Sequence, residues 1–324
     1  TRAFVAVACL AVPALLLSSA LRQALICAGR SRDVLLSHLA TVPVNVGLNA
    51  VLGFGVFGLP RLGTAGIALS TTIACWLCML TQFFLLGRTP HWVIIWKRAD
   101  EHRCRDIRAN LLGLGWPVAA AVLLEVGAFH LTSLVAARFG AEWLGAHVLA
   151  TQVASIAFAL PLGLAQAAAA VSAETRSRDT SCAPAIRVAL LLAIGTSAVA
   201  SILLLCVRTP LAFFLAPRGD ITTSVYLGSL LVPVAFFHLG DAVQCVAAGL
   251  LRGLGVSRAS LLGALGAYAV VAPGLALGLV PRHGVPGIWW ALAGAMICAA
   301  AFLSRLAAVA ARSVWVHADP GTAA

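Results

Sequence analysis

Two acidic residues interrupt long apolar stretches of this 324-residue sequence. Glu125 lies about 14 residues into the apolar segment 111–136, which corresponds to about 21 Å of helix at 1.5 Å per residue. Asp241 lies about 10 residues before the end of the segment 222–251. A carboxyl group in apolar surroundings is costly to keep, so we expect both residues to exchange a proton or bind a metal cation such as Na⁺.

Two histidines lie close to these acids in the sequence. His238 is three residues before Asp241 and on the same helix face, where it would tune the acid, share its proton or fill space. His130 is five residues after Glu125, about 140° around the helix, so we expect no joint action.

Three amides are further candidates. Asn45 and Asn49 are four residues apart and form a polar stripe in the segment 34–57, directly after Pro43. They could line a cavity for a substrate or hydrogen-bond to another helix. Gln152, in the segment 144–172, has the same two interpretations.

The composition defines the solvent of these segments. Apolar residues make up 61% of the chain and charged residues 10%, and the mean hydropathy is +0.99. A soluble domain could not bury so much apolar surface, so most of the chain must lie in a lipid bilayer. The net charge of +11 comes from basic residues in short loops, which indicates orientation rather than a nucleic-acid partner. The nine cysteines are scattered and lack the spacing of a zinc site.

Nine stretches are long and apolar enough to cross a bilayer as helices. They are approximately 3–28, 34–57, 64–87, 111–136, 144–172, 184–207, 222–251, 260–281 and 285–311. Such lengths exclude porin strands, so we predict an all-α, polytopic membrane protein. Trp289 and Trp290, near the start of the last stretch, are expected to anchor it at the membrane interface.

The loops differ strongly in positive charge. Fifteen Lys and Arg residues fall in alternate loops and the C-terminal tail, against five in the other set. By the positive-inside rule, the first set and the C-terminus are cytoplasmic.

A weak internal repeat relates the two ends of the chain. Gly-Arg-Ser-Arg at 29–32 matches Gly-Val-Ser-Arg at 255–258, and Gly-Thr-Ala-Gly at 63–66 matches Gly-Val-Pro-Gly at 284–287. The offsets, 226 and 221, are nearly equal. Parallel repeats of this kind are typical of transporters with two similar halves.

The repeat predicts the domain organisation. Residues 1–87 would form the C-terminal half of a first lobe, 88–110 a cytoplasmic linker, and 111–324 a second lobe of six helices with a short cytoplasmic tail. Shifting the second lobe back by the repeat offset predicts about 115 further residues, or three helices, before Thr1. The whole would contain twelve spans in two six-helix lobes.

Several functional classes lack their motifs. We find no nucleotide-binding GxxxxGK[ST], no HExxH, no GxSxG and no TVGYG filter. The linker 88–110 interleaves acids with its basic residues, so it is a poor nucleic-acid site. We therefore expect neither an enzyme nor a nucleic-acid-binding protein.

Short motifs are distributed over both predicted lobes. The first lobe contains Pro-Val-Asn-Val-Gly-Leu-Asn at 43–49, Gly-Val-Phe-Gly-Leu-Pro at 55–60 and Gly-Thr-Ala-Gly at 63–66. The second lobe contains Leu-Glu-Val at 124–126, Gly-Ala-His at 145–147, Pro-Leu-Gly at 161–163, Gly-Asp-Ala-Val-Gln at 240–244 and Gly-Leu-Leu-Arg-Gly at 249–253. In the order and spacing of these motifs the sequence resembles the multidrug and toxic compound extrusion (MATE) family.

The resemblance implies a bacterial NorM-like antiporter, monomeric and multi-pass in the inner (cytoplasmic) membrane. It would export small organic cations by alternating access, driven by Na⁺ or H⁺ and with no other cofactor. Glu125 and Asp241 match the second-lobe acids that bind the coupling cation in that branch. Asn45 and Asn49 match a polar pair in the first lobe.

The chain departs from the family pattern at 171–174, where Val-Ser-Ala-Glu replaces the usual Val-Gly pair and leaves the helix packing open.

Three other functions remain. A lipid-linked precursor flippase of the same superfamily would need Arg or Lys in its cavity, a membrane-embedded enzyme would turn over a covalent substrate, and a structural subunit would not need buried acids.

Overall fold

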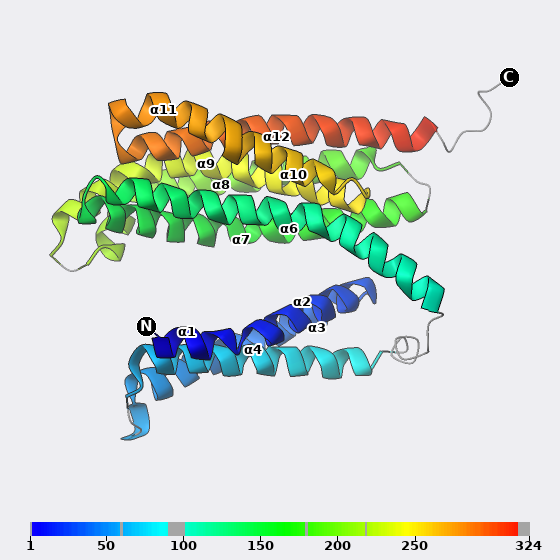
Figure 1. Cartoon of the computed structure of the whole chain (residues 1–324), viewed down its shortest axis with the longest axis horizontal. Helices are drawn as coiled ribbons and strands as arrows, with labels where there is room; N and C mark the ends of the chain where they lie inside the picture. Colours follow the sequence, from blue (N-terminus) through cyan, green and yellow to red (C-terminus); the bar gives the residue numbers. More distant parts are fainter. Residues whose placement is uncertain (1, 59–60, 90–100, 179–180, 218, 317–324) are drawn as a thin grey trace. The chain divides into compact units, whose positions relative to one another are not determined.

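The computed structural model describes residues 2–58, 61–89, 101–178, 181–217 and 219–316, and every regular element in these ranges is helical. Nine of its helical segments are long and apolar enough to cross a membrane, which confirms the predicted all-α, multi-span architecture. The chain divides into two compact units, residues 1–101 and 102–324, which are described separately (Figure 1).

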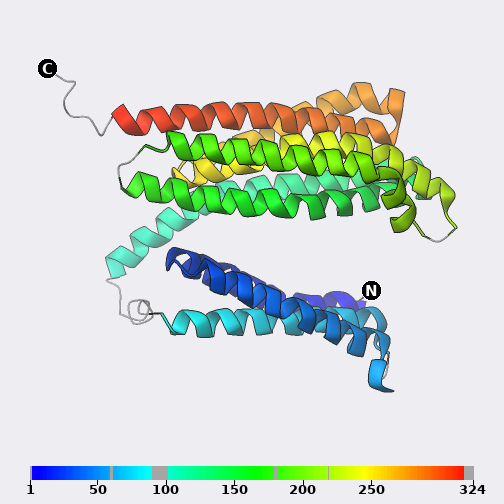
Figure 2. The same cartoon turned by 180° about the vertical axis from the view of Figure 1, so that it is seen from behind.

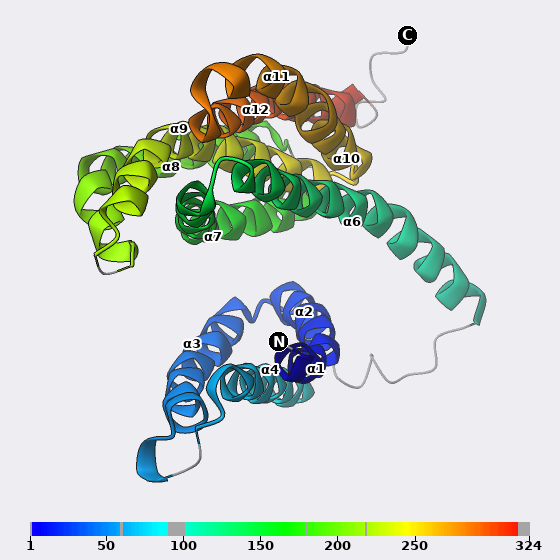
Figure 3. The same cartoon turned by 60° about the vertical axis from the view of Figure 1, so that its left-hand side comes forward.

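Unit 1 contains α1 (Arg2–Cys9), α2 (Val12–Cys27), α3 (Ser31–Leu48), the π-helical segment η1 (Asn49–Gly53), the short 3₁₀ turn η2 (Val56–Gly58) and α4 (Gly63–Gly87). The apolar helix α4 packs against α1, α2 and α3. Figure 3 shows α2 and α3 on two sides of α4. Gly66 permits close contact between α4 and η1, because a Cβ atom there would lie 2.6 Å from the backbone carbon of Leu52.

The first predicted span is broken in the structure. Pro13 has no N–H and its ring disfavours a continuous helix, so α1 and α2 are separated by a turn at Leu10 and Ala11. Side chains of α4 donate to the carbonyls near the break: Trp76 Nε1 lies 3.0 Å from Leu10 O, and Thr72 Oγ1 lies 3.1 Å from Val7 O. These hydrogen bonds replace partners that a bilayer does not provide.

Unit 2 contains α6 (Glu101–Ala137), α7 (Ala141–Ser177), α8 (Ala183–Leu215), α9 (Ile221–Gly253), α10 (Arg258–Ala264), the π-helical segment η3 (Leu265–Val271), α11 (Ala272–His283) and α12 (Val285–Val316). The helix that we expected to begin at about residue 111 begins at Glu101. Residues 90–100 of the predicted linker, and the predicted tail after residue 316, lie outside the described residues.

Helix α9 is the centre of unit 2. It packs against α7, α8 and α12, and 72% of the residues in its spanning segment are buried, against 44% or less in the other spans (Figure 1; Figure 2). Asp220 caps its N-terminus by accepting a hydrogen bond of 2.9 Å from the Thr223 N–H. Hydrogen bonds from the Thr223 side chain and backbone hold the pKa of the Asp220 carboxyl below its ordinary value. Residues on α9 are therefore fixed on several sides.

Small residues bring α7 and α9 into close contact. Gly249 and Gly253 of α9 lie directly against the backbone of α7 at Ala165 and Ala169. This is the small-residue spacing that permits close helix approach in membranes. Ser172 is fully buried, and its hydroxyl oxygen lies 2.7 Å from Ala168 O of its own helix and 3.1 Å from Leu250 O of α9. The serine therefore links α7 to α9 rather than disturbing their packing.

The close contact predicts a large effect of Gly249→Val. The added side chain has no room against Ala165 and forces α7 and α9 apart, with an overpacking cost of about 1–3 kcal/mol. We expect the apparent melting temperature of the purified protein to fall by about 2–6 °C. Gly163→Val is the matched control, because Gly163 is also inside a helix but has open space around it. Equal melting temperatures for the two variants would contradict the packing.

Candidate functional site

A cavity of about 270 Å³ lies among α6, α7 and α9 and contains both predicted acids. Glu125 comes from α6 and Asp241 from α9. The other residues that line the cavity are Val126, Phe129, His130, Thr151, Ala154, Ser155, Phe158 and Phe237. The fold thus places two carboxyl groups, far apart in the sequence, in one space.

Helical periodicity brings these side chains together. Asp241 and Phe237 are four residues apart on α9, and Glu125 and Phe129 are four apart on α6. Residues at this spacing lie one above the other on a helix face. The neighbouring row of α6 contributes Val126 and His130, so the cavity covers a sector of about 140° on that helix. His130 therefore lines the same cavity as Glu125, although the two residues lie about 140° apart around α6.

Asp241 is held inside unit 2. Asp241 is 3% exposed. Gln244, one turn further along α9, donates a hydrogen bond from Nε2 to Asp241 Oδ1 over 3.0 Å. Glu125 is half-buried at the same cavity. The cavity therefore combines one enclosed carboxyl group with one that is more accessible.

The cavity has an uncompensated acidic character. None of the described residues that line it is a Lys or an Arg, and its only titratable residue other than the two acids is His130. An ionised carboxyl group away from water requires a positive partner, because the free energy of desolvation is otherwise not recovered. A proton, a metal ion or an organic cation can supply that charge. The oxygen-bearing side chains in the lining are those of Glu125, Asp241, Thr151 and Ser155.

Aromatic rings form one wall of the cavity. The ring centroids of Phe129 and Phe237 are 5.9 Å apart, with the rings edge to face. The ring centroid of Trp289, on α12, lies 5.6 Å from that of Phe237 and 5.6 Å from that of His147 on α7. We expected Trp289 at the membrane interface; it is instead fully buried, and only Trp290 is partly exposed. Its position in the core follows from the α9–α12 packing.

Two predicted residues lie away from the cavity. His238 is on α9, but it is 2% exposed and packs inside unit 2 without lining the cavity. Gln152 is exposed on α7 and points elsewhere. Their neighbours Phe237, Thr151 and Ser155 line the cavity instead. The sequence alone placed a polar face on each helix but not its rotation.

The two asparagines form a separate polar cluster in unit 1. Asn49 Nδ2 donates to Asn45 Oδ1 over 3.0 Å, and Ser70 of α4 donates to Asn49 Oδ1. Asn49 is also the first residue of η1, and π-helical segments are frequent at functional sites. The pair thus makes the helix-to-helix hydrogen bond that was one of its two interpretations.

Unit 1 contains a second buried polar cluster, which the sequence pattern did not predict. Gln82 of α4 is fully buried; its Oε1 accepts from Ser18 of α2 over 2.8 Å, and its Nε2 lies 3.4 Å from Ser37 Oγ and 3.3 Å from His38 Nε2 of α3. A single glutamine inside an apolar run was the available signal. The cluster joins the three helices by hydrogen bonds that are favourable in lipid.

Nine apolar helical segments and an acid-lined cavity inside the larger unit define a multi-pass membrane protein. Residues 117–277, which include both acids, match the family described as MatE. The chain is 34% identical over 291 residues to the "Probable multidrug resistance protein NorM" of Burkholderia mallei, covering 85% of this chain and 60% of the relative. It is 31% identical over 319 residues to the protein of the same name from Geobacillus kaustophilus, covering 95% of this chain and 68% of the relative.

The chain belongs to the MATE family, a family of membrane transporters and not of enzymes. Solved structures share the fold. The eukaryotic MATE transporter AtDTX14 superposes with a TM-score of 0.80 at 17% identity, covering 95% of this chain and 70% of that structure. The Vibrio cholerae MATE transporter VcmN in its bent form superposes with a TM-score of 0.73 at 16% identity, covering 92% and 66%. The chain spans about 60% of the length of its Burkholderia mallei relative.

The cavity geometry predicts which positions on α7 meet water. In a cysteine-free background, Ser155→Cys places a thiol on the cavity lining, whereas Ile156→Cys places one on the apolar outer surface of the same helix, at a residue that is 76% exposed. A thiol reacts as the thiolate, which forms readily only where water reaches it. We expect a water-soluble maleimide to label Ser155→Cys about 10-fold faster or more. Equal rates in membranes would contradict a water-accessible cavity.

Proposed function

We propose that this chain acts as part of a cation-coupled multidrug antiporter, which exports organic cations in exchange for Na⁺ or H⁺. The observation that carries the proposal is the pairing of Glu125 and Asp241 in one cavity that has no Lys or Arg in its lining among the described residues. The names of the NorM relatives support export of drugs as the activity. The transport activity is that of the whole protein in its natural reading frame.

The two carboxyl groups provide the exchange. They require positive charge, and the coupling ion and the organic cation both supply it. An organic cation enters the protein from the cytoplasm and binds at the carboxyl groups. A proton or Na⁺ that arrives from outside then neutralises the same oxygens and lowers the affinity of the site for the drug. Coupling then follows from the competition of two cations for the same site, which differs in affinity between the two transport states.

The rest of the cavity suits organic cations. Phe129, Phe158 and Phe237 line it beside the acids, so an aromatic or alkyl group can pack against their rings while its charge stays near a carboxyl group. A cation over an aromatic face gains about 0.5–2 kcal/mol. Such contacts depend little on the detailed shape of the ligand, which is consistent with a broad range of substrates.

Transport by alternating access would use the two lobes predicted from the repeat. The cavity lies wholly within unit 2, so we assign coupling-ion binding to the second lobe. We infer that Asn45 and Asn49 line the substrate path from the first lobe. The charge distribution favours a cytoplasmic C-terminus, and the bacterial NorM relatives support insertion in the inner membrane of a bacterium.

Neutralising either acid should abolish exchange. We expect Asp241→Asn and Glu125→Gln, expressed in the natural reading frame, to reduce ethidium efflux from cells by at least about 10-fold, because the site no longer holds a cation. Both replacements keep the size of the side chain, so membrane abundance should be unchanged. Glu142→Gln is the matched control, since Glu142 is an exposed acid in the first turn of α7 and does not line the cavity.

Normal efflux by Asp241→Asn at equal abundance would overturn the site assignment. Efflux by the parent that requires Na⁺ would identify the coupling ion as Na⁺, and efflux that continues without Na⁺ but stops when a protonophore removes the proton gradient would identify it as H⁺.

A further inference from the structure

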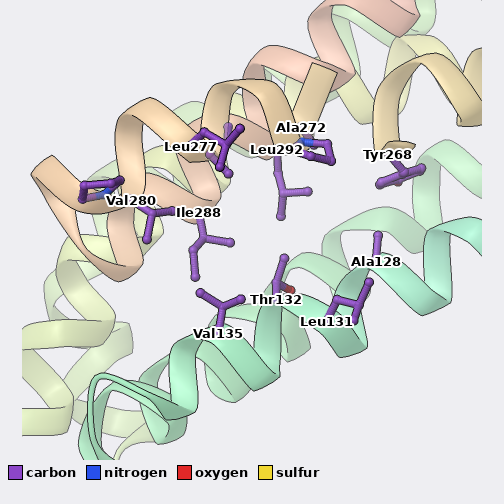
Figure 4. A pocket seen from close by; sticks show the side chains of 14 residues that line it. Ala128, Leu131, Thr132, Val135, Tyr268, Ala272, Leu277, Val280, Ile288 and Leu292 are labelled. Carbon is purple, nitrogen blue, oxygen red and sulfur yellow. The ribbon is translucent and has the colours of Figure 1, made fainter. Parts of the chain in front are cut away.

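A second and larger pocket lies on another side of α6, away from the acidic cavity. It has a volume of about 440 Å³, within the usual range of ligand sites. Figure 4 shows side chains of α6 on one side of it and those of η3, α11 and α12 on the other. Its lining consists of Ala128, Leu131, Thr132, Val135, Tyr268, Ala272, Pro273, Ala276, Leu277, Val280, Pro281, Ile288, Ala291 and Leu292. We call it the α6–α11 groove.

The α6–α11 groove presents almost only hydrocarbon to an occupant. Its two hydroxyl groups already have partners: Thr132 Oγ1 donates to Phe129 O over 2.8 Å, and the Tyr268 hydroxyl donates to Met296 Sδ over 3.7 Å. Among the described residues, the lining includes no charged side chain. The charge of an organic cation would therefore have no partner in this lining, whereas an alkyl chain has no charge or hydrogen bond to satisfy.

The shape of the groove suits a chain rather than a compact molecule. It follows α11 from Ala272 to Val280, about 12 Å at 1.5 Å per residue. The groove is open to the surroundings, as two of its lining residues show: Leu131 is 63% exposed and Leu277 is 81% exposed. An alkyl chain lying along the groove would cover both side chains.

One end of the groove carries positive charge. Arg138 follows the lining residue Val135 by one turn, and Arg282 directly follows the lining residue Pro281. The two arginines belong to the same end, because the ring of Phe139 would lie 3.6 Å from a Cβ atom at Gly284. Among the described residues, neither arginine forms an ion pair; both are exposed, and the neighbouring acid is Glu142.

We propose that the α6–α11 groove binds an anionic phospholipid, with one acyl chain between α6 and α11 and the headgroup phosphate at Arg138 and Arg282. Guanidinium groups bind phosphate through paired hydrogen bonds, which gives the site its preference for this headgroup region. An anionic phospholipid carries a net negative charge, whereas a zwitterionic lipid offers its phosphate together with a compensating cation. The two arginines therefore favour the anionic lipid. This proposal does not depend on the transport mechanism.

Lipid binding to the delipidated, purified protein in detergent tests the proposal. Native mass spectrometry would compare palmitoyl-oleoyl phosphatidylglycerol with the phosphatidylcholine of identical chains. We expect phosphatidylglycerol to bind more tightly, and the double variant Arg138→Gln/Arg282→Gln to lower its affinity by about 10-fold or more towards that of phosphatidylcholine. Arg208→Gln is the charge-matched control, because Arg208 lies at another pocket of unit 2, and it should not change the affinity.

A second pair of variants tests the acyl-chain part of the site. Ala276→Phe fills the groove and should weaken binding of both lipids, whereas Ala119→Phe, on an exposed part of α6 outside the groove, should not. Equal melting temperatures of the two variants would show that folding is preserved. The proposal would be overturned by unchanged lipid binding of Ala276→Phe or by equal affinity of the parent for the two lipids. It would also be overturned if the parent formed a dimer that Ala276→Phe abolishes, because a second protein copy would then occupy the groove.

Discussion

The structure of unit 2 depends on the cost of keeping carboxyl groups away from water. Moving a carboxylate from water into a medium of low dielectric constant costs several kcal/mol even after the protein relaxes. Asp241 is almost wholly enclosed, and the only protein hydrogen bond to it in the described residues comes from the neutral Gln244. Because none of the described residues that line the cavity is a Lys or an Arg, this lining offers no positive partner to Asp241 and Glu125. A site that is incomplete without a cation suits a protein that exchanges one cation for another.

The surrounding helices keep this costly arrangement in place. Helix α9 carries Asp241 and is packed on three sides, with Gly249 and Gly253 allowing α7 to approach closely. The same contact positions Thr151 and Ser155 of α7 at the cavity. Trp289 supports the aromatic wall from α12. Tight packing by small residues thus fixes the positions of the acids, while the cavity between them stays open for a ligand.

Much of the fold and the central pair of acids could be predicted from the sequence. Spans of about 20 apolar residues are unmistakable, and an acid inside one stands out because the bilayer makes it costly. The repeat and the family resemblance indicated that Glu125 and Asp241 belong to one lobe. Helix rotation could not be predicted: His238 and Gln152 carried the polar signal, yet Phe237 and Thr151 face the cavity.

Other features depended on contacts between distant segments. The break before Pro13 is stabilised by Trp76 and Thr72, which lie more than 60 residues away. Ser172 departs from the family pattern, and its hydroxyl group lies within hydrogen-bonding distance of Leu250 O on α9. Tryptophan near a helix start usually lies at the membrane interface, whereas Trp289 is buried. In each case a partner on another helix decides the outcome, and the local sequence carries no record of it.

The central claim is that the coupling ion and the organic cation compete for the same two carboxyl groups. Equilibrium binding of ethidium to the purified protein, measured by fluorescence across a range of Na⁺ concentrations and pH, tests it most directly. The account predicts strictly competitive behaviour: the apparent Kd for ethidium rises in proportion to the concentration of the coupling ion, while the number of ethidium sites stays constant. An apparent Kd that is independent of both Na⁺ and H⁺, or that reaches a plateau as either ion saturates, would show that drug and ion bind at separate sites and would contradict it.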